Sequence, residues 1–90
     1  PLRVEGRQVS WNYRVFRIEH PNGEVTFGVH EAYYHDRNDP LPHSATATSV
    51  EAQGETLLKL ADELSRMLSA CSKPVLAFDG NKIVEWRAAK

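Results

Sequence analysis

The stretch Trp11–Tyr34, which reads WNYRVFRIEHPNGEVTFGVHEAYY, decides the fold of this chain. Two runs rich in aromatic and β-branched residues, Trp11–His20 and Val25–Tyr34, flank the turn signal Asn22-Gly23. An Asn-Gly pair supplies the two positive-φ residues that a type I′ turn requires. The stretch therefore predicts a β-hairpin over residues 11–34.

The same turn predicts the register of the hairpin, because a two-residue loop fixes which strand residues lie opposite each other. This register gathers four apolar side chains on one face as the expected core: Phe16, Ile18, Phe27 and Val29. At the edge of that face it places Arg14 opposite Glu31. We interpret this pair as a structural cross-strand ion pair rather than as an acid–base pair for catalysis.

The opposite face of the hairpin is too apolar for an ordinary solvent-exposed surface. It carries aromatic and aliphatic side chains next to a basic one, namely Trp11, Tyr13, Val15, Arg17 and Ala32. Aromatic residues beside an arginine are typical of protein interfaces. We expect this strip to be covered either by the C-terminal segment 75–86 or by a partner protein or second copy of the chain.

Apolar residues recur at spacings of three and four after Thr56, which predicts one amphipathic helix over residues 56–72. They are Leu57, Leu60, Ala61, Leu64, Met67, Leu68 and Cys71. Thr56 is the expected N-cap, and Pro74 ends the helix. Two i,i+4 ion pairs are predicted on the polar side, Glu55–Lys59 and Asp62–Arg66. We expect Cys71 to be a buried, unreactive thiol on the apolar side.

The remaining segments complete one expected domain over residues 1–90. Residues 35–44 contain two prolines and many turn formers, which predicts a surface loop. Residues 45–50 alternate small and hydroxyl side chains, which predicts a short strand, and residues 75–86 predict a strand or hairpin. The sequence thus predicts an α+β fold, with an antiparallel sheet of three to four strands and one helix packed on one face.

Composition restricts the classes of function. A chain of 90 residues with 41% hydrophobic and 26% charged residues is expected to form one globular domain. Its 11 basic and 12 acidic residues give a net charge of −1, which argues against binding nucleic acid or acidic membranes by bulk charge. A lone cysteine and the lack of an apolar run of about 20 residues predict a cytoplasmic protein without a membrane span.

Candidate chemistry is sparse. Three histidines, His30, His35 and His43, fall within fourteen residues, and zinc accepts such ligands. Their spacing matches no tight metal motif, so a metal- or small-molecule-responsive domain that uses loop 35–43 is an alternative hypothesis. Single-stranded nucleic-acid binding on the hairpin is another, because basic and aromatic residues interleave along residues 11–17. No P-loop, G-x-G-x-x-G or G-x-S-x-G motif occurs, and we predict a non-enzymatic protein without a cofactor.

Two further stretches resemble the HicB-like antitoxin domain. In that family a strand ends in a Pro-Asp-Leu-Pro-Gly-type loop and a Gly-x-Thr opens the helix; the matching stretches are Asp39–His43 and Gly54–Leu57. The resemblance covers about residues 13–72 and does not include the DNA-binding extension of the family. It implies an antiparallel sheet carrying one helix, a dimer, and binding to a small protein. Together with the strip on the hairpin, it predicts an antitoxin-like protein-interaction module and homodimer.

Overall fold

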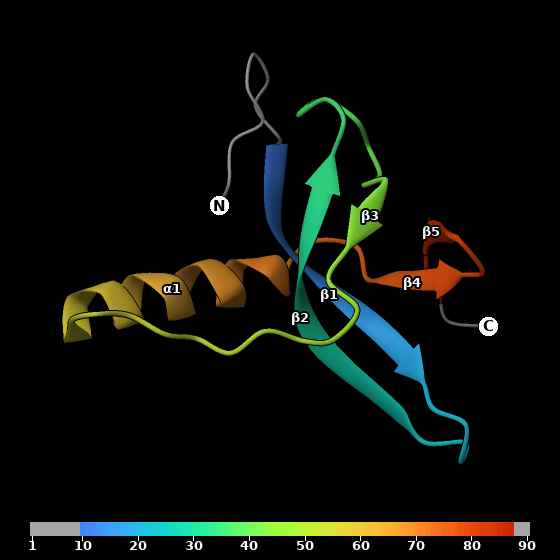
Figure 1. Ribbon diagram of the computed structural model, residues 1–90, viewed down its shortest axis with the longest axis horizontal. Helices are drawn as coiled ribbons and strands as arrows, with labels where there is room; N and C mark the ends of the chain where they lie inside the picture. The colour runs from blue at the N-terminus through green and yellow to red at the C-terminus, as the bar shows by residue number, and fades with distance from the viewer. Residues whose placement is uncertain (1–9, 88–90) are drawn as a thin grey trace.

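The computed structural model describes residues 10–87, so residues 1–9 and 88–90 of the expected domain lie outside the described residues. Within the described part, one helix and five strands form an α+β fold (Figure 1). The elements are β1 (Ser10–Glu19), β2 (Val25–Tyr34), β3 (Ser44–Ala45), α1 (Leu57–Ala70), β4 (Leu76–Asp79) and β5 (Lys82–Glu85). The α+β class and the single helix agree with the prediction. In this part of the chain, no helix is long and apolar enough to cross a membrane.

The strands form one mixed sheet in the order β3-β2-β1-β4-β5. Neighbouring strands are antiparallel except β1 and β4, which run parallel and meet at Phe16 and Leu76. The sheet therefore has more strands than predicted and is not purely antiparallel, because α1 carries the chain back so that β4 enters beside β1 in the same direction. The predicted strand at 45–50 is shorter, and beyond Ala45 only isolated backbone hydrogen bonds continue along β2.

The hairpin turn between β1 and β2 differs by one residue from the predicted turn. The strands end at the pair Glu19–Val25. Gly23, with a φ of +91°, donates its N–H to the carbonyl oxygen of His20 at 2.9 Å. A type I′ turn would need a positive φ at Asn22 as well, and among the described residues only glycines have one.

Pro21 explains this difference. Its ring fixes φ near −65°, which suits a central position of an ordinary turn, and it has no N–H to offer to a strand partner. The shifted register moves Phe27 and Val29 to the face opposite Phe16 and Ile18, because successive strand residues alternate between faces. The predicted core face made of these four residues is therefore wrong.

Two apolar clusters lie on the two faces of β1 instead. On one face the buried residues are Phe16, Leu76 and Ile83, and the ring of Phe16 stacks on Phe78 with centroids 4.8 Å apart. The cluster on the other face joins β1 to α1 and contains Tyr13, Val15, Met67 and Ala70. The helix thus packs on the face that the sequence analysis expected either the C-terminal segment 75–86 or a partner to cover.

Arg14 is buried on the Phe16 face, where it pairs in register with His30. Its guanidinium donates to the hydroxyl of Tyr34 at 3.0 Å and to the carbonyl oxygen of Pro74 at 2.9 Å. Glu31 lies opposite Tyr13 on the other face, so the predicted Arg14–Glu31 ion pair does not form. Arg14 instead ties β1 to the segment that connects α1 with β4.

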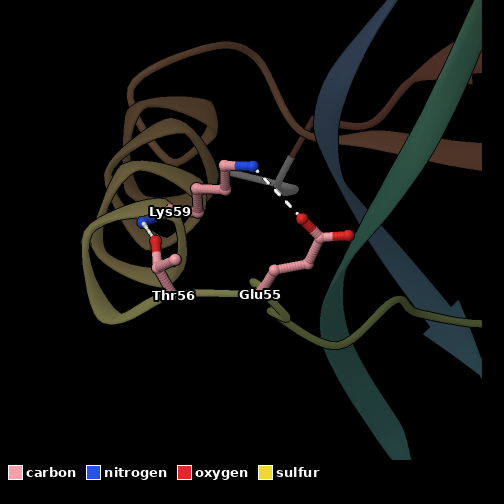
Figure 2. A network of polar contacts seen from close by, with 3 residues as sticks. All are labelled: Glu55, Thr56 and Lys59. Atoms are coloured by element: carbon pink, nitrogen blue, oxygen red, sulfur yellow. Dashed lines mark hydrogen bonds and ion pairs between the residues drawn. The ribbon is translucent and has the colours of Figure 1, made fainter.

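The start of α1 is held by the local contacts that the sequence predicts. The Thr56 hydroxyl accepts the backbone N–H of Lys59 at 3.1 Å, and the Lys59 ammonium lies 3.2 Å from the Glu55 carboxylate (Figure 2). The second predicted pair also forms, with 2.9 Å between Arg66 and Asp62. Figure 1 shows α1 extending away from the sheet, with its C-terminal end near the strands and its N-terminal end far from them.

Candidate interaction surface

One apolar side of α1 is left uncovered by the rest of the described chain. Leu57 is 81% exposed, Leu64 is 51% exposed and Leu68 is 72% exposed. Ala61 lies between them on the same side and is also exposed. We call Leu57, Ala61, Leu64 and Leu68 the leucine row. The apolar stripe of the sequence is therefore divided between a buried edge at Met67 and an exposed row.

The position of the helix on the sheet explains this division. Met67 and Ala70 pack against β1 from the C-terminal half of α1, and the Tyr13 hydroxyl donates to the Glu63 carboxylate beside them. These contacts hold the helix by one edge of its apolar stripe. At about 100° per residue, the leucine row lies roughly a quarter turn around the helix from Met67. The sheet therefore cannot cover it.

The leucine row carries no charge. The two ion pairs of the helix, Glu55–Lys59 and Asp62–Arg66, connect side chains on its polar side. A contiguous exposed apolar surface is the usual appearance of a protein-interaction site on a soluble domain. The row therefore has the chemistry of a docking surface for another apolar surface.

A second exposed patch lies at the far end of the hairpin. Phe27 is 57% exposed and meets the ring of Trp86 edge to face, with centroids 6.0 Å apart. The guanidinium of Arg17 lies 4.9 Å from the centre of the Trp86 ring. This aromatic patch contains Arg17 from the predicted strip, together with two residues that the sequence analysis did not assign to a surface.

The predicted contact strip does not form one exposed surface. α1 covers Tyr13 and Val15, and Ala32 is fully buried on the opposite face of the sheet. Trp11 is half-buried and packs edge to face on Tyr13, with ring centroids 5.2 Å apart. Arg17 is also half-buried, at the aromatic patch. α1 therefore covers Tyr13 and Val15 from within the chain, and the shifted register separates Ala32 from them.

The structure does not bring the three candidate metal-ligating histidines together. The rings of His35 and His43 stack with centroids 3.8 Å apart, whereas His30 is buried beside Phe16. The Nδ1 of His30 lies 2.8 Å from the carbonyl oxygen of Thr46. Between residues 10 and 87, no group of three His, Cys, Asp or Glu side chains could hold a metal ion.

A shallow cleft of about 400 Å³ separates β1 from the C-terminal half of α1. Its lining combines an aromatic wall with polar and basic side chains: Trp11, Asn12, Tyr13, Arg66, Ser69 and Lys73. Two basic side chains beside an indole ring suit a small ligand with an anionic group and a flat apolar part. Loop 35–43 does not contribute to this cleft.

The sequence analysis assigned the leucine row to the core. The sequence did contain a signal for this exposed surface. The seven apolar positions of the helix cover a broader arc of its circumference than one small sheet can contact. The thiol of Cys71 continues the same side and is exposed, not buried as predicted. No protein-family model, curated protein or solved structure matches the chain.

Proposed function

We propose that this chain is a small, non-enzymatic protein-interaction module that docks through the leucine row of α1. The observation that carries the proposal is the exposure of Leu57, Leu64 and Leu68 along one uncharged side of the helix. Full burial of a leucine side chain contributes about 1.5–3 kcal/mol. Three such side chains can offset much of the entropy lost when two molecules associate.

The likeness to HicB-like antitoxins supports the same class of function, since those domains bind a small protein. It rests on loop 39–43 and on the Gly54-x-Thr56 start of the helix. A cytoplasmic location fits this proposal, because the single thiol, Cys71, is exposed and a reducing compartment keeps such a thiol free.

The proposal is tested by comparing two variants that each remove exposed apolar surface. The double variant Leu64→Ser/Leu68→Ser disrupts the row, and Phe27→Ser disrupts the aromatic patch as the matched control. Each protein is used to capture partners from nuclease-treated and untreated extract of its own organism, and its self-association is measured by sedimentation.

We expect the wild type and Phe27→Ser to retain a protein partner or to self-associate in both extracts, and the row variant to do neither while keeping its circular dichroism spectrum. Unchanged association in the row variant would overturn the proposal, as would a wild type that binds nothing. Capture that nuclease abolishes would favour the nucleic-acid hypothesis instead.

A second candidate function is binding of a small anionic ligand in the cleft beside Trp11. Lys73 makes no ion pair within the described residues and lines this cleft. Titration with benzoate and with inorganic phosphate, followed by amide NMR shifts, distinguishes an aromatic anion from a simple one. Shifts that centre on Trp11 and disappear in Lys73→Ala are expected if the cleft is a site. Shifts spread over the surface would contradict it.

A further inference from the structure

The N-terminal half of β1 turns backbone hydrogen-bonding groups out of the sheet. On β2 the carbonyl oxygens of Val29, Glu31 and Tyr33 face away from β1, since they accept N–H groups from the chain around β3. In an antiparallel pair, residues whose backbone groups do not bond to each other face in opposite directions. Trp11 and Tyr13 are the partners of Tyr33 and Glu31. Their N–H and carbonyl groups therefore point out of the other edge of β1.

β4 covers only a later part of this edge. It begins at Leu76, which pairs with Phe16 of β1. Within residues 10–87, no backbone hydrogen bond or strand pairing reaches Trp11 or Tyr13 from this side. An open strand edge is a template for pairing with another strand. The first residues of β1 thus offer such a template beside the place where β4 enters the sheet.

The cleft of about 400 Å³ at Trp11 lies against this open edge. One wall consists of Trp11, Asn12 and Tyr13, and the other contains Arg66 and Ser69 of α1. An extended peptide in this cleft would lie about 4.8 Å from β1, the usual distance between paired strands. Its main chain would bond to the outward groups of Trp11 and Tyr13, and the edge-to-face rings of these two residues would contact its side chains.

The charge of the cleft determines which peptide it suits. Arg66 and Lys73 are basic, and none of the described residues that line the cleft is acidic. Arg66 shares its charge with Asp62 at 2.9 Å, whereas the described residues give Lys73 no ion pair. Lys73 is also exposed. An acidic side chain complements this charge, and a basic one is repelled by it.

We propose that an extended, acidic peptide of another protein binds in this cleft as an added strand beside β1. The proposal deepens the second candidate function, on which it rests, and does not depend on the leucine row. Main-chain hydrogen bonds to Trp11 and Tyr13 hold the peptide extended, and Lys73 selects an acidic side chain. Alternate side chains of the peptide face the ring of Trp11, where β-branched and aromatic residues pack well on a strand.

Amide hydrogen exchange followed by NMR tests the proposal on the full chain. The probe is a mixture of peptides acetyl-Thr-X-Glu-X-Thr-amide, in which X is Val, Ile, Phe or Tyr. One control mixture carries Gln in place of Glu, and a second has both X residues N-methylated, which removes main-chain donors. Lys73→Glu reverses the charge in the cleft. Lys82→Glu is the matched control, since Lys82 is exposed on β5 and does not line the cleft.

We expect the N–H groups of Trp11 and Tyr13 to exchange rapidly in the free protein, and those of Asn12 and Arg14, which face β2, to exchange slowly. At a peptide concentration about ten times the binding midpoint, about nine in ten molecules are bound. Exchange at Trp11 and Tyr13 should then slow by about tenfold. The N-methylated mixture should give no such protection.

Lys73→Glu should weaken peptide binding by about fivefold or more, because it replaces the attraction of an exposed ion pair with a repulsion. The Gln mixture should also bind more weakly to the wild type. Lys82→Glu should bind the Glu mixture as the wild type does. Equal binding of the Glu and Gln mixtures, or equal losses in the two lysine variants, would overturn the proposal.

Protection of Trp11 and Tyr13 in the free protein would also overturn the proposal. Protection at every concentration would show that another segment of this chain covers the edge, and protection that grows with concentration would show a second copy. If benzoate shifts the amide signals around Trp11 but no peptide protects them, the small-ligand function stands and this proposal fails. Leu64→Ser/Leu68→Ser should bind the peptides as the wild type does, so capture through the leucine row and peptide binding succeed or fail separately.

Discussion

The Phe16 cluster and the leucine row consist of the same kind of side chain in opposite surroundings. Phe16 and Leu76 have no exposed surface, because side chains of β4 and β5 pack against Phe16 on that face of the sheet. Leu57 and Leu68 are more than two-thirds exposed on a helix that the sheet touches along one edge. The chain thus covers one apolar surface by itself, and its described residues leave the other exposed. The first should determine stability, and the second should determine association.

The largest expected effect is on the Phe16 cluster, which the chain buries by itself. Phe16→Ala removes a fully buried ring that stacks on Phe78, and we expect a loss of about 3–5 kcal/mol in the free energy of unfolding. Urea denaturation followed by circular dichroism measures it. A loss below about 1 kcal/mol would mean that this cluster is not the closed core of the domain.

Two neighbouring residues of α1 lie in these two opposite surroundings, one buried and one exposed. Met67 is buried against β1, whereas Leu68 is 72% exposed in the leucine row. We expect Met67→Ala to lower the free energy of unfolding by about 2–5 kcal/mol. Leu68→Ala should change it by less than about 0.5 kcal/mol when the protein is dilute enough to be monomeric. Similar losses in the two variants, by urea denaturation, would contradict the assignment of the two sides.

The N-cap of α1 gives a smaller effect. The Thr56 hydroxyl holds the first turn through the Lys59 N–H, and few tertiary contacts support that end of the helix. Thr56→Ala should cost about 1 kcal/mol. Amide hydrogen exchange should be faster in the first turns of the variant, with little change around Met67. Equal changes at both ends of α1 would show that the N-terminal end is packed after all.

The smallest expected effect concerns pH. The Tyr33 hydroxyl donates to the Glu31 carboxylate at 2.5 Å, and this hydrogen bond, partial burial and the negative charge of Glu31 raise the pKa of Tyr33 to about 12. The usual value of about 10 applies to the unfolded chain. The resulting stabilisation is complete below pH 10 and is lost as pH rises through about 12.

Tyr33→Phe should therefore lack the part of the alkaline stability loss that the wild type shows between pH 10 and 12. Thermal unfolding across that range measures the difference. Since Tyr33 lies on β2 and not in the leucine row, the pH effect should be the same in Leu64→Ser as in the wild type. A pH effect that disappears in Leu64→Ser would instead link Tyr33 to association.

The features that depend on local sequence could be predicted. Thr56 and the periodic leucines determine where α1 begins and how far it extends, because capping and helical spacing act within a few residues. The C-terminal hairpin also follows from local signals, since Gly80 has a φ of +64° in the short turn between Asp79 and Lys82.

The face of the sheet that each residue occupies could not be predicted. Pro21 and Asn22-Gly23 favour different turns, and a change of one residue reverses the face of every side chain on one strand. The exposure of the leucine row depends on where α1 sits relative to β1, which is a long-range contact. The parallel pairing of Phe16 with Leu76 is equally remote in sequence.

The central claim is that the leucine row is a docking surface. Capture from nuclease-treated extract together with sedimentation equilibrium, for the wild type and for Leu64→Glu, tests it most directly. We predict that the wild type retains a protein partner or self-associates, and that Leu64→Glu does neither while it stays folded, because a charge in the row opposes apolar contact. A wild type that binds nothing, or a Leu64→Glu variant that associates as the wild type does, would contradict the claim.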